Sequence, residues 1–316
     1  MVHKYSLLGF IEGLLHFSPR QGRNETLAAN YIVETLRSAG VNYTVQEFMT
    51  YLPEKARASL TVDGCNIACQ PCSFVGGVIE GKDHLVSSLI GSKYLLELPN
   101  INFNPWCDSI SQSNYYFAPA VAVAADDVRH IMTGKQIRAE VVVEKAKHIS
   151  KNILVGNNHD PEHVLFAHYD SIQSGAIDNA SGVAVLIGLI LSEPGLLKNN
   201  LFVLTGNEEL SYDKPTYWGH GYRAFETDNF RLLTKAKKIM VVDSVGNTPS
   251  HFDQNQSLLY LGFPIVHANE WAKKIWLLYG DINHLMTVYH SNDDLPVNIK
   301  ERYLKEASAL LLDHLR

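Results

Sequence analysis

The chain has 316 residues, of which 46% are hydrophobic and 19% are charged, so it can bury a sizeable core without metal ions or disulfides for stability. Its formal net charge of -6 leaves no basic surplus for binding phosphate backbones, which argues against a nucleic-acid partner. No run of about eighteen apolar residues occurs, so we expect no membrane span.

The four cysteines bear on the cellular compartment in which the protein is expected. Cys65, Cys69 and Cys72 are bunched and Cys107 stands apart, whereas a small secreted disulfide scaffold carries more cysteines at regular spacing. A reducing, cytoplasmic location is therefore expected, with secretion after removal of a leader as the alternative. The bunch could form a zinc knuckle only if Cys107 completed it, and ordinary thiols are the favoured interpretation.

Two helical patterns open the chain. The apolar stretch Tyr5–Phe17 is interrupted by Glu12, which favours an amphipathic helix over a signal peptide. A second helix is predicted over Thr26–Ser38, with Gly40 as its stop signal, and a strand over Val41–Phe48.

The pattern changes after this strand. Short alternating runs such as Ala58–Val62 and turn formers such as Asp63-Gly64 occur between Pro53 and Lys147. We therefore predict a small β-rich inserted domain at residues 53–147, and a larger domain made of residues 1–52 and 148–316.

From Asn152 onward, strand, loop and helix alternate. The predicted strands are apolar throughout, as in a buried and mostly parallel sheet, and comprise Val164–Phe166, Leu201–Leu204 and Ile239–Val242. Helices are predicted over Asn179–Ser192 and Ile299–Leu315. The fold class of this part is therefore α/β.

Acids and histidines fall where these strands end. His168, Glu208 with Glu209, and Asp243 each lie at or just past the carboxyl end of a predicted strand, which is the edge where open α/β sheets bind ligands. Asp178 stands directly before a predicted helix, where its alternative role is a simple N-cap. The spacing thus predicts that residues distant in sequence converge at one edge.

Together these segments resemble those of the co-catalytic di-zinc aminopeptidases, a branch of the zinc exopeptidase superfamily. The resemblance is carried by five segments: Ala167-His168-Tyr169-Asp170, Asp178-Asn179-Ala180-Ser181-Gly182, Gly206-Asn207-Glu208-Glu209, Val242-Asp243-Ser244-Val245-Gly246 and Tyr289-His290-Ser291-Asn292-Asp293-Asp294. It implies a three-layer α/β/α (phosphorylase/hydrolase-like) core. The stretch Ala118–Val143 also resembles the end of the protease-associated domain inserted in many such enzymes.

The resemblance also implies a ligand set. Asp178 would bridge two zinc ions, His168 and Asp243 would complete one site, and Glu209 and His290 would complete the other. Nitrogen and oxygen ligands of this kind suit zinc, and two zinc ions about 3.5 to 4 Å apart can share one carboxylate. Cobalt or manganese could occupy the same donors.

Glu208 matches the family position of the general base, which takes a proton from the attacking water. Adjacent residues of an extended segment point to opposite sides, so the loop after Leu204 must twist if Glu208 and Glu209 are both to face the metals.

Supporting residues are implied as well. Asp170 matches the position that orients a ligand, here His168, and a similar role is suggested for Asp294 towards His290, with helix capping as the alternative. Other histidines and acids, including His220 and Asp213, fall in no matching motif and are expected to have ordinary surface or core roles.

The expected function is hydrolysis of the N-terminal peptide bond of a peptide with a free N-terminus. A single-zinc glutaminyl cyclase is the first alternative, although the run Asn179–Gly182 favours a peptidase. A non-catalytic binding module on the same fold is the second, and the complete ligand set argues against it. The sequence gives no indication of the oligomeric state.

Overall fold

In the computed structural model, which describes residues 5–90 and 95–315, the chain forms two compact units. The first comprises Met1–Thr50, Ile149–Ile282 and Asp294–Arg316, and the second comprises Tyr51–His148 and Asn283–Asp293. These boundaries lie within two residues of the predicted limits at residues 52 and 147, and residues 283–293, placed in the catalytic domain by the prediction, pack with the inserted segment.

The first unit is built on a parallel core. Strands β9, β10, β11 and β13 run parallel in the order β13-β11-β9-β10, with β12 antiparallel at one side and β8 antiparallel at the other. Their bounds are β8 Ile137–Gly156, β9 His163–His168, β10 Asn200–Thr205, β11 Lys238–Val242, β12 His251–Asp253 and β13 Ile275–Tyr279. The residues of β9 and β10 are buried throughout, which agrees with their continuous hydrophobic sequence.

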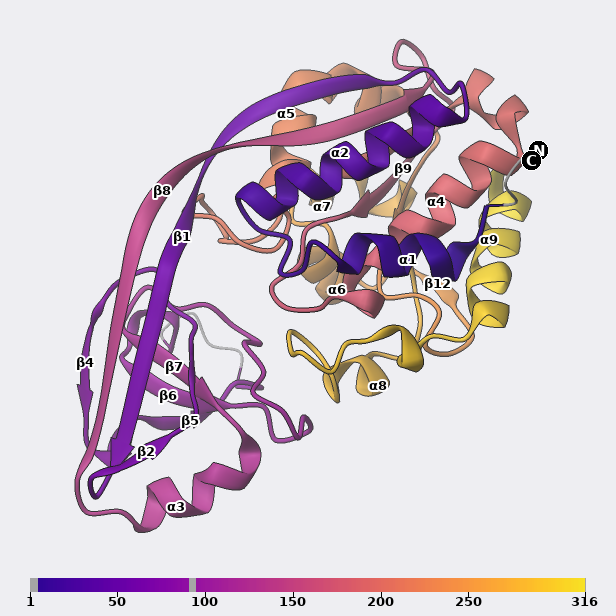
Figure 1. Ribbon diagram of the computed structural model, residues 1–316. Helices are drawn as coiled ribbons and strands as arrows, with labels where there is room; N and C mark the ends of the chain where they lie inside the picture. The colour runs from indigo at the N-terminus through magenta and orange to yellow at the C-terminus, as the bar shows by residue number, and fades with distance from the viewer. Residues whose placement is uncertain (1–4, 91–94, 316) are drawn as a thin grey trace. The chain divides into compact units, whose positions relative to one another are not determined.

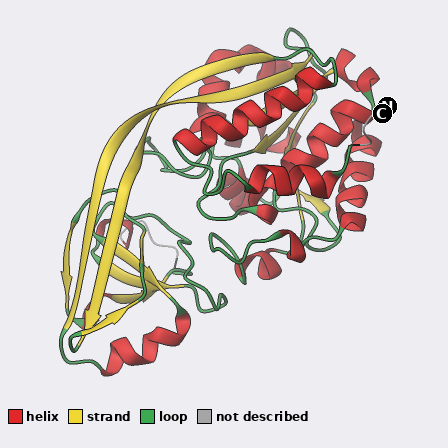
Figure 2. Cartoon of the chain, viewed as in Figure 1, coloured by secondary structure: helices red, strands yellow, loops and turns green. Residues whose placement is uncertain are grey.

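Helices cover this sheet on both faces (Figure 2). The helix α4 contacts β9, and the N-terminal helix α1 and the C-terminal helix α9 pack on α4, as Figure 1 shows. The helices of this unit are α1 Leu7–Leu15, α2 Arg23–Ser38, α4 Ser181–Ser192, α5 His220–Lys235, α6 Gln256–Gly262, α7 Ala268–Trp271 and α9 Glu301–Leu315, and α8 Ile282–Met286 begins at its boundary. Short 3-10 turns occur at Pro194–Lys198, Ala272–Lys274 and Pro296–Asn298, and a π turn at Ala176–Ala180.

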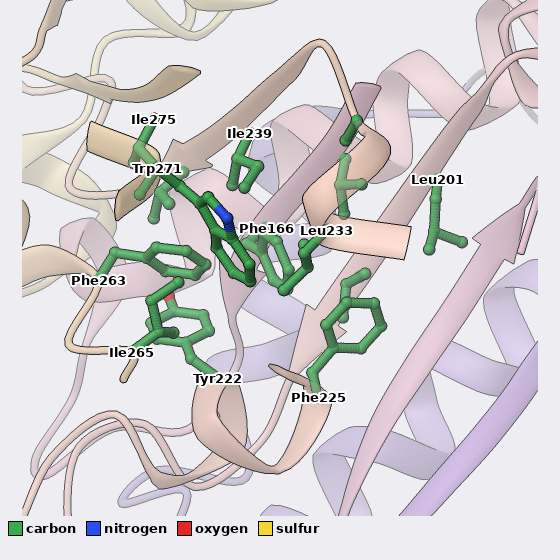
Figure 3. Close-up of a cluster of buried hydrophobic side chains, with 14 of the residues drawn as sticks. Phe166, Leu201, Tyr222, Phe225, Leu233, Ile239, Phe263, Ile265, Trp271 and Ile275 are labelled. Atoms are coloured by element: carbon green, nitrogen blue, oxygen red, sulfur yellow. The ribbon is translucent and has the colours of Figure 1, made fainter. Parts of the chain in front are cut away.

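The other face carries a hydrophobic core, shown in Figure 3. Phe166 of β9 packs against Tyr222 and Phe225 of α5, with ring centroids 5.7 and 5.2 Å apart. Leu165 and Ala167 alternate with Phe166 and so point to the opposite face, where they are equally buried. Both faces of the sheet are therefore covered, which confirms the predicted three-layer α/β/α arrangement and the mostly parallel sheet.

The second unit is rich in strands. A four-stranded sheet has the order β3-β7-β6-β5 in the described part of this unit, and its core includes Ile101, Val121 and Val123. The elements are β1 Thr44–Val62, which begins in the first unit, β2 Cys65–Ile67, β3 Gln70–Pro71, β4 Gly77–Glu80, β5 Leu85–Ser87, β6 Asn100–Phe103, β7 Ala120–Val123, the helix α3 Val128–Thr133, and 3-10 turns at Lys82–His84, Leu95–Glu97 and Ala125–Asp127.

The strand β1 is longer than predicted. The sequence indicated two runs, Val41–Phe48 and Ala58–Val62, separated at Pro53, but β1 continues through this proline. A proline removes only one ladder donor and is tolerated where its nitrogen faces away from a partner strand. The predicted turn at Asp63-Gly64 is confirmed, because it joins β1 to β2 with both residues at positive φ.

Helix α1 confirms the amphipathic helix expected near the N-terminus, with Phe10, Ile11 and Leu14 buried. No helix among the described residues has the length and apolar character needed to cross a bilayer.

Candidate metal centre

The parallel register brings the predicted ligands of the first unit together. Thr205 pairs with His168, and Val241 pairs with Phe166, so the segments that follow β10 and β11 emerge beside His168. His168 is the last residue of β9 and is almost fully buried. The prediction that these strand ends meet at one edge is confirmed.

The donor atoms lie at spacings that suit a shared cation. His168 Nε2 is 3.2 Å from Asp178 Oδ1 and 3.6 Å from Asp243 Oδ2. Ligand atoms of His168, Asp178 and Glu209 all lie within 4.8 Å of one another. Tetrahedral ligands about 2.1 Å from a zinc ion lie about 3.4 Å apart, so one nitrogen and several carboxylate oxygens at these spacings fit zinc.

Asp178 is held by a residue from the far end of the chain. The carboxylate of Asp294 accepts hydrogen bonds from the backbone amides of Ile177 and Asp178, at 2.8 and 3.1 Å. The Asp294 carbonyl also accepts one from the amide of Ala176. The carboxylate of Asp294 thus holds the loop that carries Asp178, and its suggested role towards His290 stays a prediction.

Two residues of the Asn-Ala-Ser-Gly run tie this loop to the end of β11. Asn179 donates from Nδ2 to the carbonyl of Val242 at 2.8 Å, and its Oδ1 accepts from the amide of Ser244 at 3.3 Å. Ser181 Oγ accepts from the amide of Val245. The run thus fixes Asp178 relative to Asp243, and Asp178 is not the N-cap of α4, which is Ala180.

The loop after β10 has the twist that two metal-facing glutamates require. Asn207 has φ +52, in the left-handed region, and Glu208 and Glu209 follow it. The amides of Glu208 and Glu209 both donate to the carboxylate of Asp170, at 3.0 and 2.9 Å. One buried carboxylate therefore fixes both residues.

Asp170 also faces His168. Its Oδ1 lies 3.5 Å from His168 Nδ1, a long contact rather than a short hydrogen bond. Asp170 thus contacts three of the predicted site residues through their backbone or ring, and its role in orienting His168 stays a prediction.

Electrostatics set the protonation of the cluster without a cation. Burial opposes charging of His168, but the attraction of Asp243 and contacts with Asp170 and Asp178 raise its pKa well above the ordinary value. Burial raises the pKa of Glu208 well above its usual range, with the charge of His168 acting in the opposite direction. Dense negative charge around one histidine is the environment that a bound metal ion would neutralise.

His290 belongs to the second unit. Its ring nitrogen Nδ1 lies 3.1 Å from the carbonyl oxygen of Gln112, and its φ is +50. Its place among the metal ligands stays a prediction.

A comparison with models of protein families matches the segment that contains these residues. Residues 152–291 match the model of peptidase family M28. The matched segment contains every predicted ligand together with Glu208 and Asp170. The zinc exopeptidase resemblance found in the sequence motifs is thereby confirmed. A comparison with curated protein sequences gives no significant match.

Solved structures of the same fold include a zinc aminopeptidase from Bacillus subtilis, at 17% identity and a TM-score of 0.69, covering 96% of this chain and 92% of that one. An aminopeptidase from Aneurinibacillus sp. strain AM-1 matches at 17% identity and a TM-score of 0.61, with coverage of 96% and 92%. A glutaminyl cyclase from Porphyromonas gingivalis matches at 15% identity and a TM-score of 0.53, with coverage of 98% and 96%. At these identities the likeness shows the fold.

One residue that the sequence motifs did not reveal supports the M28-like site. Arg20 is fully buried, and its guanidinium donates to the carbonyls of Tyr169, Ser174 and Gly175 at 2.5, 2.9 and 2.8 Å and to the hydroxyl of Ser18 at 2.8 Å. The loop it holds connects Asp170 with Asp178.

Burial lowers the pKa of Arg20 to about 10, while four nearby carboxylates favour its charge. It remains a cation at neutral pH, beside a cluster of acids. A single arginine in a Ser-Pro-Arg-Gln loop carries no periodic or motif signal, so only the folded structure reveals this role.

Among the residues that the structure describes, the group with metal-ligand geometry contains no cysteine, and all four thiols are free. Burial raises the pKa of Cys72 to about 12 and that of Cys69 to about 11, which disfavours thiolate ligands.

Proposed function

We propose that this chain is a zinc-dependent aminopeptidase with two metal ions, which hydrolyses the N-terminal bond of peptides. The observation that carries the proposal is the convergence of His168, Asp178 and Glu209 within 4.8 Å, with Asp243 beside them, in a segment that matches a peptidase family.

Asp178 is the proposed bridging ligand. The proposal assigns His168 and Asp243 to one zinc ion, and Glu209 and His290 to the other. Support for His290 comes from the covalent chain, because it lies four positions before Asp294, whose carboxylate holds the amide of Asp178. Four residues span at most about 14 Å when fully extended.

When bound, zinc supplies a Lewis acid that polarises the scissile carbonyl and lowers the pKa of the attacking water. Glu208 takes a proton from that water and returns it to the leaving amine. Glu208 is almost fully buried, so water other than the attacking molecule has little access to its carboxylate. Asp170 holds Glu208 by its amide, so the base keeps its position during the proton transfers.

The activity is tested with a panel of aminoacyl chromogenic amides, with and without a chelator, beside a peptide whose N-terminus is blocked. We expect hydrolysis of the free amides, loss of activity with the chelator and recovery with zinc, cobalt or manganese. Cleavage of the blocked peptide would contradict an exopeptidase. Cyclisation of an N-terminal glutamine peptide without release of an amino acid would favour a glutaminyl cyclase.

The ligand assignment is tested by counting metal. Asp178→Ala should lose metal from both sites, whereas His290→Ala should empty one, because only the first residue is shared. Full occupancy in Asp178→Ala would refute bridging, and a metal-free native protein would favour a binding module. The cytoplasmic location expected from the cysteines stays a prediction.

A further inference from the structure

The loop that carries His290 is bound by the inserted segment. We call residues 286–293 the His290 loop and residues 104–113 the insert segment; both belong to the second unit. The backbone of Gln112 pairs with His290 in both directions: the Gln112 amide donates to the His290 carbonyl at 3.0 Å, and the Gln112 carbonyl lies 3.1 Å from His290 Nδ1.

Further side chains of the insert segment bind the same loop. Ser111 Oγ donates to the carbonyl of Tyr289 at 2.6 Å, and Asn104 Nδ2 donates to the carbonyl of Met286 at 2.9 Å. The hydroxyl of Ser109 donates to Asp293. Asn104 and Ser111 are almost completely buried, so their side chains are themselves held in place, and bonds from such fixed donors specify the position of the loop that accepts them.

Gln112 is itself anchored to the insert. Its Nε2 donates to the carbonyl of Pro71 at 2.5 Å, in strand β3, and to the hydroxyl of Tyr115 at 3.1 Å. The position of the His290 backbone is thus tied to the four-stranded sheet. His290 also has φ +50, a conformation that a non-glycine residue keeps only when its surroundings hold it.

The contact at Nδ1 fixes the chemistry of the ring. A backbone carbonyl can only accept, so His290 Nδ1 must carry the hydrogen, and in the neutral ring the lone pair is then on Nε2. A histidine whose other nitrogen donates to a carbonyl is oriented and made more basic as a metal ligand.

We propose that the insert positions His290 as a metal ligand, setting its Nε2 tautomer through the Gln112 carbonyl and its backbone through Ser111 and Asn104. This inference rests on the proposed function, in which His290 is a ligand of the second zinc ion. Residues 104–113 would then act on the metal ion through His290, as positioning residues.

The first test is the tautomer. Long-range ¹H–¹⁵N spectra of the metal-free, full-length protein should show His290 protonated at Nδ1. A hydrogen on Nε2 would overturn the inference, and this measurement does not depend on any variant folding.

The second test measures zinc affinity by competition with a chromophoric chelator. Ser111→Ala and Gln112→Ala should weaken one of the two zinc steps by about 10- to 100-fold and leave the other unchanged. The matched control is Ser73→Ala, a buried serine of the same unit whose hydroxyl bonds only to Val75 and Ala118. It should leave both steps unchanged.

The reference variant His290→Ala separates two kinds of failure. If it loses one zinc step while Ser111→Ala and Gln112→Ala bind zinc normally, the present inference is refuted and the ligand assignment stands. If His290→Ala keeps both steps, the ligand assignment fails and the inference falls with it.

Discussion

Replacing Asp170 by asparagine removes a negative charge and one hydrogen-bond acceptor from a side chain that contacts three of the predicted site residues. The carboxylate accepts from the amides of Glu208 and Glu209 and lies 3.5 Å from His168 Nδ1. An asparagine side chain has one acceptor oxygen, and its NH2 group can only donate. One of the two glutamate amides would therefore face another donor.

The size of the effect follows from these contacts. A hydrogen bond to a charged group contributes about 1.5 to 3 kcal/mol, and Asp170→Asn loses one such bond and weakens the other. Removing one negative charge from the acidic cluster offsets part of this loss, so we expect the metal-free protein to be about 2 kcal/mol less stable. Zinc affinity should fall about 10- to 100-fold, and kcat/KM about 100-fold, because Glu208 loses its fixed position.

Urea unfolding with chelator present, zinc competition and aminoacyl amide hydrolysis measure the three effects of Asp170→Asn. The control is Asp213→Asn, the same substitution at a carboxylate that pairs with His220 and Arg223. It should reduce stability without changing zinc affinity. Wild-type zinc affinity and kcat/KM in Asp170→Asn would refute the positioning role.

Three further predictions concern single residues. Glu208→Gln should keep its full zinc content by elemental analysis while kcat falls by about 10²- to 10⁴-fold, since only proton transfer is removed; unchanged turnover would exclude Glu208 as the base. Arg20→Lys keeps the positive charge but cannot reproduce the three hydrogen bonds to carbonyls. Urea unfolding should therefore show that the free energy of unfolding falls by about 2 to 4 kcal/mol. An unaltered unfolding midpoint would show that the loop does not depend on the guanidinium. Burial alone would raise the pKa of Asp213, but His220 and Arg223 lower it to about 2. The pKa of Asp213 in the folded state therefore lies below its unfolded value of about 4. Its ionised form contributes about 1 to 2 kcal/mol of stability above pH 4, and this contribution is lost as the pH falls towards 2. Asp213→Asn should abolish this pH dependence between 4 and 2, and an identical acid profile in that variant would refute it.

The sequence predicted the elements whose signal is local. The strands β9, β10 and β11 were found because buried parallel strands are apolar at every position. The acids after them were found because strand ends share one edge of the sheet. Motif resemblance supplied Asp170, and its carboxylate lies where an orienting group must be.

Contacts between distant segments could not be predicted in this way. For Asp294 the sequence suggested a role towards His290 or a helix cap, but it gave no sign that the carboxylate accepts from the amides of Ile177 and Asp178. Arg20 lies about 150 residues from the loop that it holds. Neither contact leaves a periodic or motif signal in the sequence, because each depends on how two loops meet in the folded chain.

These contacts also explain how so many acids can be buried together. The guanidinium of Arg20 bonds only to carbonyls and a hydroxyl, so its charge is not matched by a directly bonded carboxylate. Asp170, Asp178, Glu209 and Asp294 all contribute to keeping it charged. Burial raises the pKa of Asp294 to about 7, and the charge of Arg20 acts in the opposite direction. A buried arginine behind the loop that carries Asp178 therefore offsets part of the negative charge of the acidic cluster, while its bonds to three backbone carbonyls hold that loop in place.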